Sequence, residues 1–175
     1  MPDQKALEYL CIYDPEFISY ASDFLEEWGR NAAAEPVGSM DDLRSVVNKY
    51  ALVRYTEVCL HGTPGMIRFA NKGAMVGSYL GTLTTSANML CRDARVLFLS
   101  CNIGEGPAGD KFLTELGKAM FKGIGGIAGA STVTNFASSG GRMNPLWNGR
   151  LKVRRFDTNG DVVGTQDIDQ FGGIH

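Results

Sequence analysis

Two side chains that can do chemistry together stand at the ends of two apolar runs. His61 follows LVRYTEVCL (residues 52–60), and Cys101 follows ARVLFLS (residues 94–100), forty residues further along the chain. Gly, Pro or Asn residues follow directly after each run and its reactive residue, which is typical of a buried parallel strand that ends in a loop. Because such strand ends share one edge of a sheet, we expect neighbouring strands to present the imidazole and the thiol side by side.

A cysteine attacks as its thiolate, and an adjacent imidazole can take the thiol proton and later return it to a leaving group. We therefore interpret His61 and Cys101 as a nucleophilic pair. Gly62 lets the backbone approach a substrate closely, and its N–H together with that of Cys101 suits the binding of an oxyanion. Two plainer interpretations stay open, namely that His61 is a core histidine and that Cys101 is a small buried hydrophobe.

Further polar residues near the same strand ends are candidates for binding a substrate. They are Ser100, Ser131, Thr132 and Glu105. Glu105 and Asp110 have an alternative role, which is to cap the helix expected near Pro107. We interpret Glu57 and Asp93 as solvated charges rather than as groups that orient His61.

The remaining pattern predicts an α/β fold with a mostly parallel sheet. Asp14 and Pro15 suit the start of one helix, and Ser39 with Asp42 imitates a capping box at the start of the next. We expect strands at 6–13, 52–60, 95–99 and 124–130, a connection at 29–38, a short β-arm at 66–69, helices beginning at Pro15, Ser39 and Pro107, a crossover helix at 74–90, a surface loop at 132–148, and a β-hairpin of 150–156 with 161–165.

Composition limits the class of protein. The 175 residues, 44% hydrophobic and 21% charged, suit a single globular domain over 1–175. A formal charge of −2 lacks the basic footprint of a nucleic-acid binder, and no run is long enough to cross a bilayer, so we expect neither partner. The N-terminal residues lack a secretory signal, which favours a cytoplasmic location, with signal-independent export left open.

The cysteines and histidines give no familiar metal-ligand set. Cys11, Cys59, Cys91 and Cys101 are expected to be free thiols. With only two histidines, at 61 and 175, and no CxxC spacing, we expect no zinc site and no cofactor.

The two blocks VRYTEVCLHGTPG and VLFLSCNIGEGPAGDKFLTEL together resemble the caspase-like cysteine peptidases, the clan of caspases, gingipains, legumain, separase and CHAT domains. The resemblance covers about residues 39–134 and is closest to the caspase-like domain of large bacterial surface proteins. It implies a three-layer αβα sandwich with a mostly parallel central sheet, to which the sequence pattern adds the C-terminal β-hairpin. It also implies that His61 is the general base and acid, that Cys101 is the nucleophile, and that Gly62 donates to the oxyanion. Ser100 stands where the clan more often has Ala or Gly.

We therefore expect a bacterial caspase-like cysteine endopeptidase that acts on a protein or peptide substrate without a cofactor, with a protein partner that activates or inhibits it as a further option. One alternative is a catalytically silent caspase-like module that binds or scaffolds. Another is a thiol hydrolase that acts on a small acyl substrate.

Overall fold

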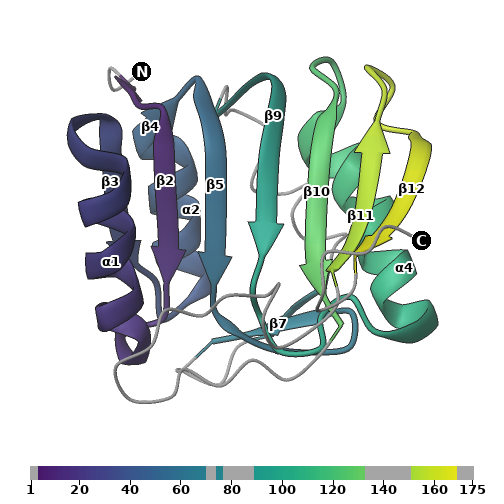
Figure 1. Ribbon diagram of the computed structural model, residues 1–175, viewed down its shortest axis with the longest axis horizontal. Helices are drawn as coiled ribbons and strands as arrows, with labels where there is room; N and C mark the ends of the chain where they lie inside the picture. The colour runs from purple at the N-terminus through teal and green to yellow at the C-terminus, as the bar shows by residue number, and fades with distance from the viewer. Residues whose placement is uncertain (1–3, 70–73, 77–88, 133–150, 169–175) are drawn as a thin grey trace.

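The computed structural model describes residues 4–69, 74–76, 89–132 and 151–168, which form a mixed α/β fold around a seven-stranded sheet (Figure 1). Its strands are β2 (Tyr9–Tyr13), β3 (Ala32–Pro36), β5 (Val53–Cys59), β9 (Leu90–Phe98), β10 (Gly126–Ser131), β11 (Leu151–Phe156) and β12 (Val162–Ile168). Their order in space is β12-β11-β10-β9-β5-β2-β3. All pairs from β10 to β3 are parallel, and β11 and β12 are antiparallel additions at one edge.

Two smaller sheets and three α-helices complete the described part of the chain. The strands β1 (Lys5–Ala6) and β4 (Tyr50–Ala51) form a parallel pair. An antiparallel sheet is made of β6 (His61–Thr63), β7 (Met66–Arg68) and β8 (Ala74–Val76). The helices are α1 (Ile18–Trp28), α2 (Met40–Lys49) and α4 (Gly106–Leu116), with 3-10 turns at Pro15–Phe17 and Gly29–Asn31 and a π-helical turn at Gly117–Phe121.

The period-two alternation of the strands divides the core between the two faces of the sheet. Leu10 and Ile12 of β2 pack in the cluster that also contains buried residues of α2 and α4. Cys11 and Tyr13 of the same strand pack with α1 in a second cluster. In Figure 1, α1 accordingly lies in front of the sheet, and α2 and α4 lie behind it.

The helix starts predicted at Pro15 and Ser39 are confirmed, and both depend on local signals. Asp14 accepts a hydrogen bond from the backbone N–H of Glu16, and Pro15 opens the turn that leads into α1. Ser39 accepts from the backbone N–H of Asp42, and the Asp42 carboxylate accepts in return from the N–H of Gly38. This reciprocal pair behaves as a capping box displaced by one residue.

Two predicted elements are wrong in part. The connection expected at 29–38 contains β3, which pairs with β2 at the edge of the sheet. The crossover helix expected at 74–90 is replaced at its start by β8 and at its end by the first residue of β9. Pairing with β7 and β5 outweighs the helical spacing of apolar residues there. Residues 77–88 lie outside the described part.

The strand predicted at 124–130 is β10, shifted to Gly126–Ser131, and the surface loop predicted at 132–148 lies outside the described residues except for Thr132. Among the residues that the structure describes, no helix has the length and apolar character needed to cross a membrane.

Candidate functional site

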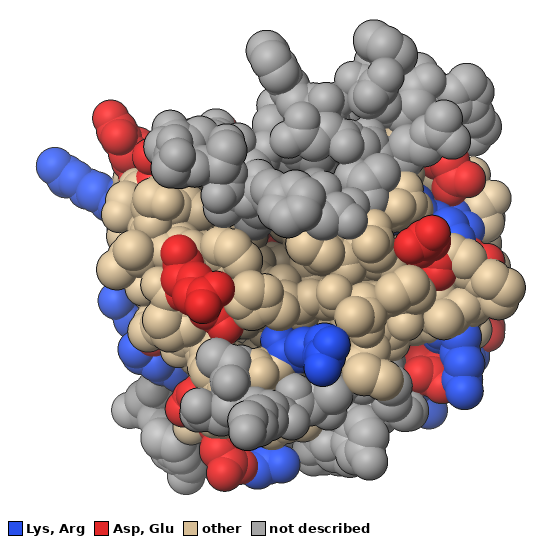
Figure 2. All heavy atoms as spheres, turned by 90° about the horizontal axis from the view of Figure 1, so that it is seen from below, with Lys and Arg blue, Asp and Glu red and all other residues tan. Residues whose placement is uncertain are grey.

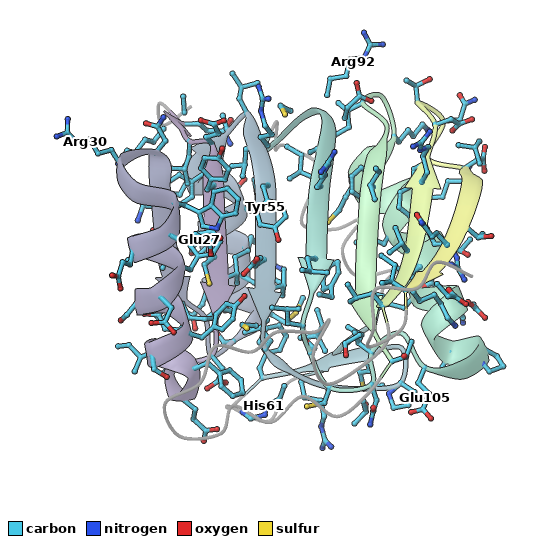
Figure 3. All side chains as sticks on the ribbon, in the orientation of Figure 1. Glu27, Arg30, Tyr55, His61, Arg92 and Glu105 are labelled. Carbon is cyan, nitrogen blue, oxygen red and sulfur yellow. The ribbon has the colours of Figure 1, made fainter. Side chains whose placement is uncertain are left out.

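The carboxyl ends of the parallel strands lie together at one edge of the molecule. Seen from that side, its described surface is mostly uncharged, with acidic and basic groups scattered over it (Figure 2). His61 and Glu105 lie at this edge, whereas Arg30 and Arg92 lie at the opposite one (Figure 3). The predicted functional residues therefore belong to the edge where such sheets place their sites.

The sheet register brings His61 and Cys101 to equivalent positions. Strands β5 and β9 are parallel neighbours, and Val58 pairs with Phe98. His61 and Cys101 each follow their member of this pair by three residues. The prediction that the two strands are neighbours is confirmed.

Gly62 brings the backbone that follows β5 against the backbone that follows β9. A Cβ at this position would lie 2.7 Å from the Cβ of Ser100 and 2.8 Å from the carbonyl oxygen of Cys101. Real Cβ atoms do not approach neighbours this closely, so any side chain would push the two segments apart. Glycine is needed here for close approach between the segments that carry the imidazole and the thiol.

The loop after β9 is held at both sides. Asn102 has φ +54°, a left-handed conformation that asparagine tolerates better than most residues, and it turns the chain directly after half-buried Cys101. The Gly65 N–H donates to the carbonyl oxygen of Ile103 at 2.9 Å, and the Gly104 N–H donates to that of Ser131 at 2.8 Å. The thiol thus stands on a fixed turn between the β6–β7 arm and the end of β10.

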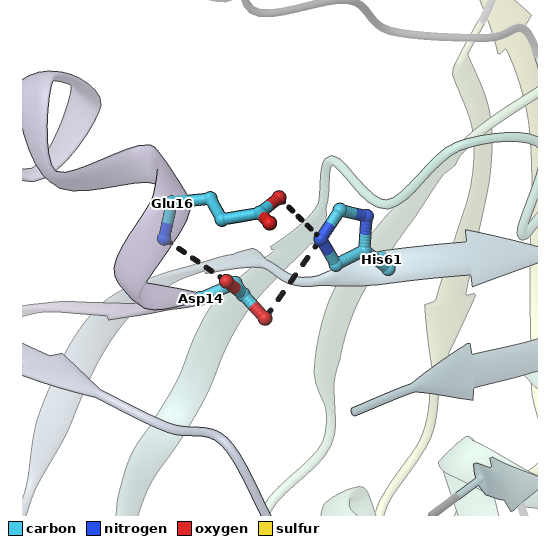
Figure 4. Close-up of side chains that lie close together, drawn as sticks. All are labelled: Asp14, Glu16 and His61. Atoms are coloured by element: carbon cyan, nitrogen blue, oxygen red, sulfur yellow. Dashed lines mark hydrogen bonds and ion pairs between the residues drawn. The ribbon is translucent and has the colours of Figure 1, made fainter. Parts of the chain in front are cut away.

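On the other side of β5, the end of β2 supplies carboxylates to His61 (Figure 4). Its Nε2 lies 3.0 Å from Oε2 of Glu16 and 3.9 Å from Oδ2 of Asp14. The Phe17 ring lies 5.1 Å from the imidazole, centroid to centroid. The His61 side chain is 42% exposed, that of Glu16 is 72% exposed and that of Asp14 only 1%.

Sequence reasoning missed these two carboxylates as neighbours of His61. Asp14 was assigned only a capping role, and Glu16 lies forty-five residues before the histidine. The structure also brings together metal-ligand types that the sequence expectation did not consider. One atom from each of Asp14, Glu16 and His61 lies within 4.8 Å of the others, which is a spacing that suits a bound cation. The expectation considered only His and Cys spacing.

The predicted substrate-binding residues differ in accessibility. Ser100 and Ser131 are buried, Thr132 is half-buried and Glu105 is exposed. Burial counts against direct contact of Ser100 or Ser131 with a substrate, so these two are placed to support the loop. Glu105 occupies the N-cap position of α4, as the alternative predicted, but its side chain makes no cap hydrogen bond. Asp110 binds Lys152 and Arg154 instead of capping the helix.

The cysteines are all free thiols, as predicted, and they differ in reactivity. Cys11 and Cys59 are fully buried, and this burial, with the nearby Glu57 charge adding to it, raises the pKa of both thiols well above the ordinary range. Both are therefore poor nucleophiles at neutral pH. Cys91 and Cys101 are half-buried, and Cys91 lies at the amino end of β9.

Glu57 is not a solvated charge, which corrects the sequence interpretation. It is buried on the α1 face of β5, where its carboxylate accepts hydrogen bonds from the Tyr20 and Tyr55 hydroxyls. The Tyr20 contact joins residues thirty-seven positions apart and has no local signal. Asp93 is exposed, as predicted.

Two hollows on the described surface lie away from this site. Both are at the amino edge of the sheet, and Arg54 and Cys91 line each of them. Neither includes His61 or Cys101.

The described residues define a mixed α/β protein on a mostly parallel sheet, with a thiol, an imidazole and carboxylates at its carboxyl edge. Residues 32–142 match the family described as a domain of unknown function, DUF4347, and the chain belongs to that family. The matched range includes His61 and Cys101 and begins after Asp14 and Glu16. A search of curated proteins found no match.

Proposed function

We propose that this chain is a caspase-like cysteine endopeptidase with Cys101 as nucleophile and His61 as general base and acid. The observation that carries the proposal is the close approach of Gly62 to Ser100 and Cys101. In addition, His61 and Cys101 each lie three residues beyond a residue pair, Val58 and Phe98, that joins the neighbouring strands β5 and β9. The proposal includes the three-layer αβα sandwich of that clan, together with a C-terminal β-hairpin.

The neighbours of His61 select the tautomer that this chemistry needs. A carboxylate only accepts hydrogen bonds, so Nε2 of His61 carries the proton that it donates to Glu16. Nδ1 is then the basic nitrogen of the neutral ring. Glu16 and Asp14 act as positioning residues that hold the imidazole with this nitrogen turned away from them (Figure 4).

The proposed reaction runs in two stages. Nδ1 takes the Cys101 proton, the thiolate sulfur bonds to the peptide carbonyl carbon, and the N–H groups of Gly62 and Cys101 receive the oxyanion. The carbon–nitrogen bond breaks as His61 returns the proton to the leaving amine, which leaves a thioester on Cys101. A water molecule, deprotonated by His61, then attacks the thioester, and the acid product leaves with the thiol restored.

The proposed substrate is a protein or peptide. The proposal also includes a protein partner that activates or inhibits the enzyme. A cytoplasmic location is part of the proposal, supported by four cysteines that are all free, since reducing compartments keep thiols in that state.

Covalent labelling tests the pair. A peptide chloromethyl ketone should modify Cys101 in the native protein, as located by mass spectrometry. Cys101→Ala should abolish labelling, and His61→Ala should slow it by about 100-fold or more. Cys91→Ser is the matched control, because it removes the other half-buried thiol and should leave labelling unchanged.

The outcome also separates the alternatives. Labelling that is indifferent to His61→Ala would contradict the proposal and favour a silent binding module. If Cys101 is labelled but a peptide library stays intact while small thioesters are hydrolysed, the protein is an acyl hydrolase instead.

A further inference from the structure

The carboxylates beside His61 form a group of three metal-ligand types that comes from two neighbouring strand ends. Asp14 and Glu16 follow β2, and His61 follows β5 (Figure 4). The register fixes this arrangement, because Tyr13 pairs with Cys59 and the Asp14 N–H donates to the Cys59 carbonyl oxygen at 2.8 Å.

The spacing of the three atoms suits a tetrahedral cation. Zn²⁺ binds His nitrogen and carboxylate oxygen at about 2.0–2.2 Å, so two ligands of a tetrahedral site lie about 3.3–3.5 Å apart. The His61 Nε2 to Glu16 distance is 3.0 Å and the His61 Nε2 to Asp14 distance is 3.9 Å, which bracket that value. All three atoms fall within 4.8 Å of one another. Small rotations of the exposed Glu16 and His61 side chains would bring all three ligand atoms to the distances of a tetrahedral site.

The carboxylate of Asp14 provides a second observation that points to a bound cation. Its Oδ1 accepts from the Glu16 N–H, which fixes the side chain at the helix start. Its Oδ2 is buried and accepts no hydrogen bond from any residue that the structure describes, although it points toward the imidazole. Leaving a buried carboxylate oxygen unpaired is costly, and such atoms are found beside a cation or a strong donor.

We propose that Asp14, Glu16 and His61 bind one Zn²⁺ ion. A neutral imidazole and two carboxylates carry two negative charges, which match a divalent cation. Three protein ligands leave the fourth position to water on the side where Glu16 and His61 are exposed. The site is thus open and exchangeable rather than structural.

The ion has a consequence for catalysis, and this step rests on the function proposed above. Zn²⁺ on Nε2 displaces the proton from that nitrogen, so the neutral ring must carry its proton on Nδ1. Nδ1 then has no lone pair to accept the Cys101 proton. Zn²⁺ binding should therefore suppress the thiolate and inhibit the peptidase.

Binding is measured first, without reference to activity. The full chain is stripped with a chelator and titrated with Zn²⁺ against a chromophoric competitor at neutral pH, and one equivalent should bind. Asp14→Asn keeps an N-cap acceptor but loses the charge, and both it and Glu16→Gln should weaken binding by more than about tenfold. Glu26→Gln, the same change at an exposed position of α1, is the matched control and should bind as the wild type does.

Cys101→Ala distinguishes this site from Zn²⁺ held by the catalytic pair. We expect this variant to retain the ion, and Co²⁺ substitution should give a spectrum without a thiolate charge-transfer band. The proposal is overturned if Cys101→Ala loses the ion while Asp14→Asn keeps it, or if no equivalent binds. Zn²⁺ that binds without slowing Cys101 labelling would preserve the site and contradict its catalytic consequence.

Discussion

At the scale of single residues, the buried carboxylate of Glu57 depends on two hydroxyl donors, one from α1 and one from its own strand β5. Tyr20 and Tyr55 each donate to it, and Tyr20 is itself buried, so burial first and the Glu57 charge second raise the Tyr20 pKa far above its ordinary value. The Tyr20 hydroxyl is therefore neutral at neutral pH, and it remains a donor.

We expect Tyr20→Phe to lower the free energy of unfolding by about 1.5–3 kcal/mol, because the carboxylate would lose a donor that water cannot replace. The measurement is urea denaturation followed by circular dichroism. Tyr55→Phe is the matched control and should cost less, since Tyr55 is only half-buried whereas Tyr20 is buried. Equal losses in the two variants would contradict this assignment.

Gly62 is the second residue-scale prediction. Gly62→Ala should destabilise the protein by about 1–3 kcal/mol, because the new methyl group would meet Ser100 and the Cys101 carbonyl. The same variant should label more slowly at Cys101 under the proposed function. Gly29→Ala serves for comparison, because Gly29 has φ +68° and open space around it, so it should lose stability through backbone strain alone. Unchanged labelling in Gly62→Ala would show that the close approach does not matter to the pair.

The sequence was sufficient to predict that His61 and Cys101 follow two neighbouring strands, because each residue ends an apolar run. Asp14 and Glu16 could not be predicted as partners of His61, since only the adjacency of β2 and β5 brings them there. Glu57 was misassigned for the same reason, because its donor on α1 is distant in the chain.

At the scale of elements, the start of α2 contains a titratable cap. The Gly38 N–H first, and the Ser39 hydroxyl next, hold the pKa of Asp42 below its usual range. A carboxylate with a lowered folded-state pKa stabilises the fold above its unfolded pKa of about 3.9, and that contribution is lost as pH falls through the folded value.

Stability should therefore decrease as the pH falls below about 5, and Asp42→Asn should show a smaller decrease than the wild type. Urea midpoints at pH 7 and pH 3 provide the comparison. Asp23→Asn changes an exposed carboxylate of α1 away from this cap and tests whether loss of any surface charge has the same effect. If Asp42→Asn retains the full pH dependence, the cap does not titrate as described.

Elements with local signals were predicted well, and those defined by pairing were not. The caps of the two helices were visible in the sequence at Asp14 and Ser39. Strand β3 has the sequence AAAEP, which lacks β-branched residues, and it exists because β2 offers it a parallel partner. Strand β8 likewise depends on β7 rather than on its own composition.

At the scale of the whole molecule, two hydrophobic clusters share one sheet. Phe24 anchors the cluster on the α1 face, and Phe112 packs edge-to-face on Phe98 in the other. Because alternate residues of the same strands supply both clusters, we expect the two faces to unfold together.

We expect Phe24→Ala and Phe112→Ala each to cost about 3–5 kcal/mol and to shift one common unfolding transition. Far-ultraviolet circular dichroism and tryptophan fluorescence should report the same midpoint in each variant. Two separate transitions in either variant would contradict the expectation of a single domain.

The equal offset of His61 and Cys101 beyond Val58 and Phe98 also bears on how this protein can change over evolution. A residue gained or lost within β5 or β9 would invert which way the following side chains face, and it would remove the pair in one event. Length changes in loops that do not contact these strand ends leave that phase untouched. Drift in loop length should therefore be tolerated in related chains, whereas the count of residues along these two strands should not vary.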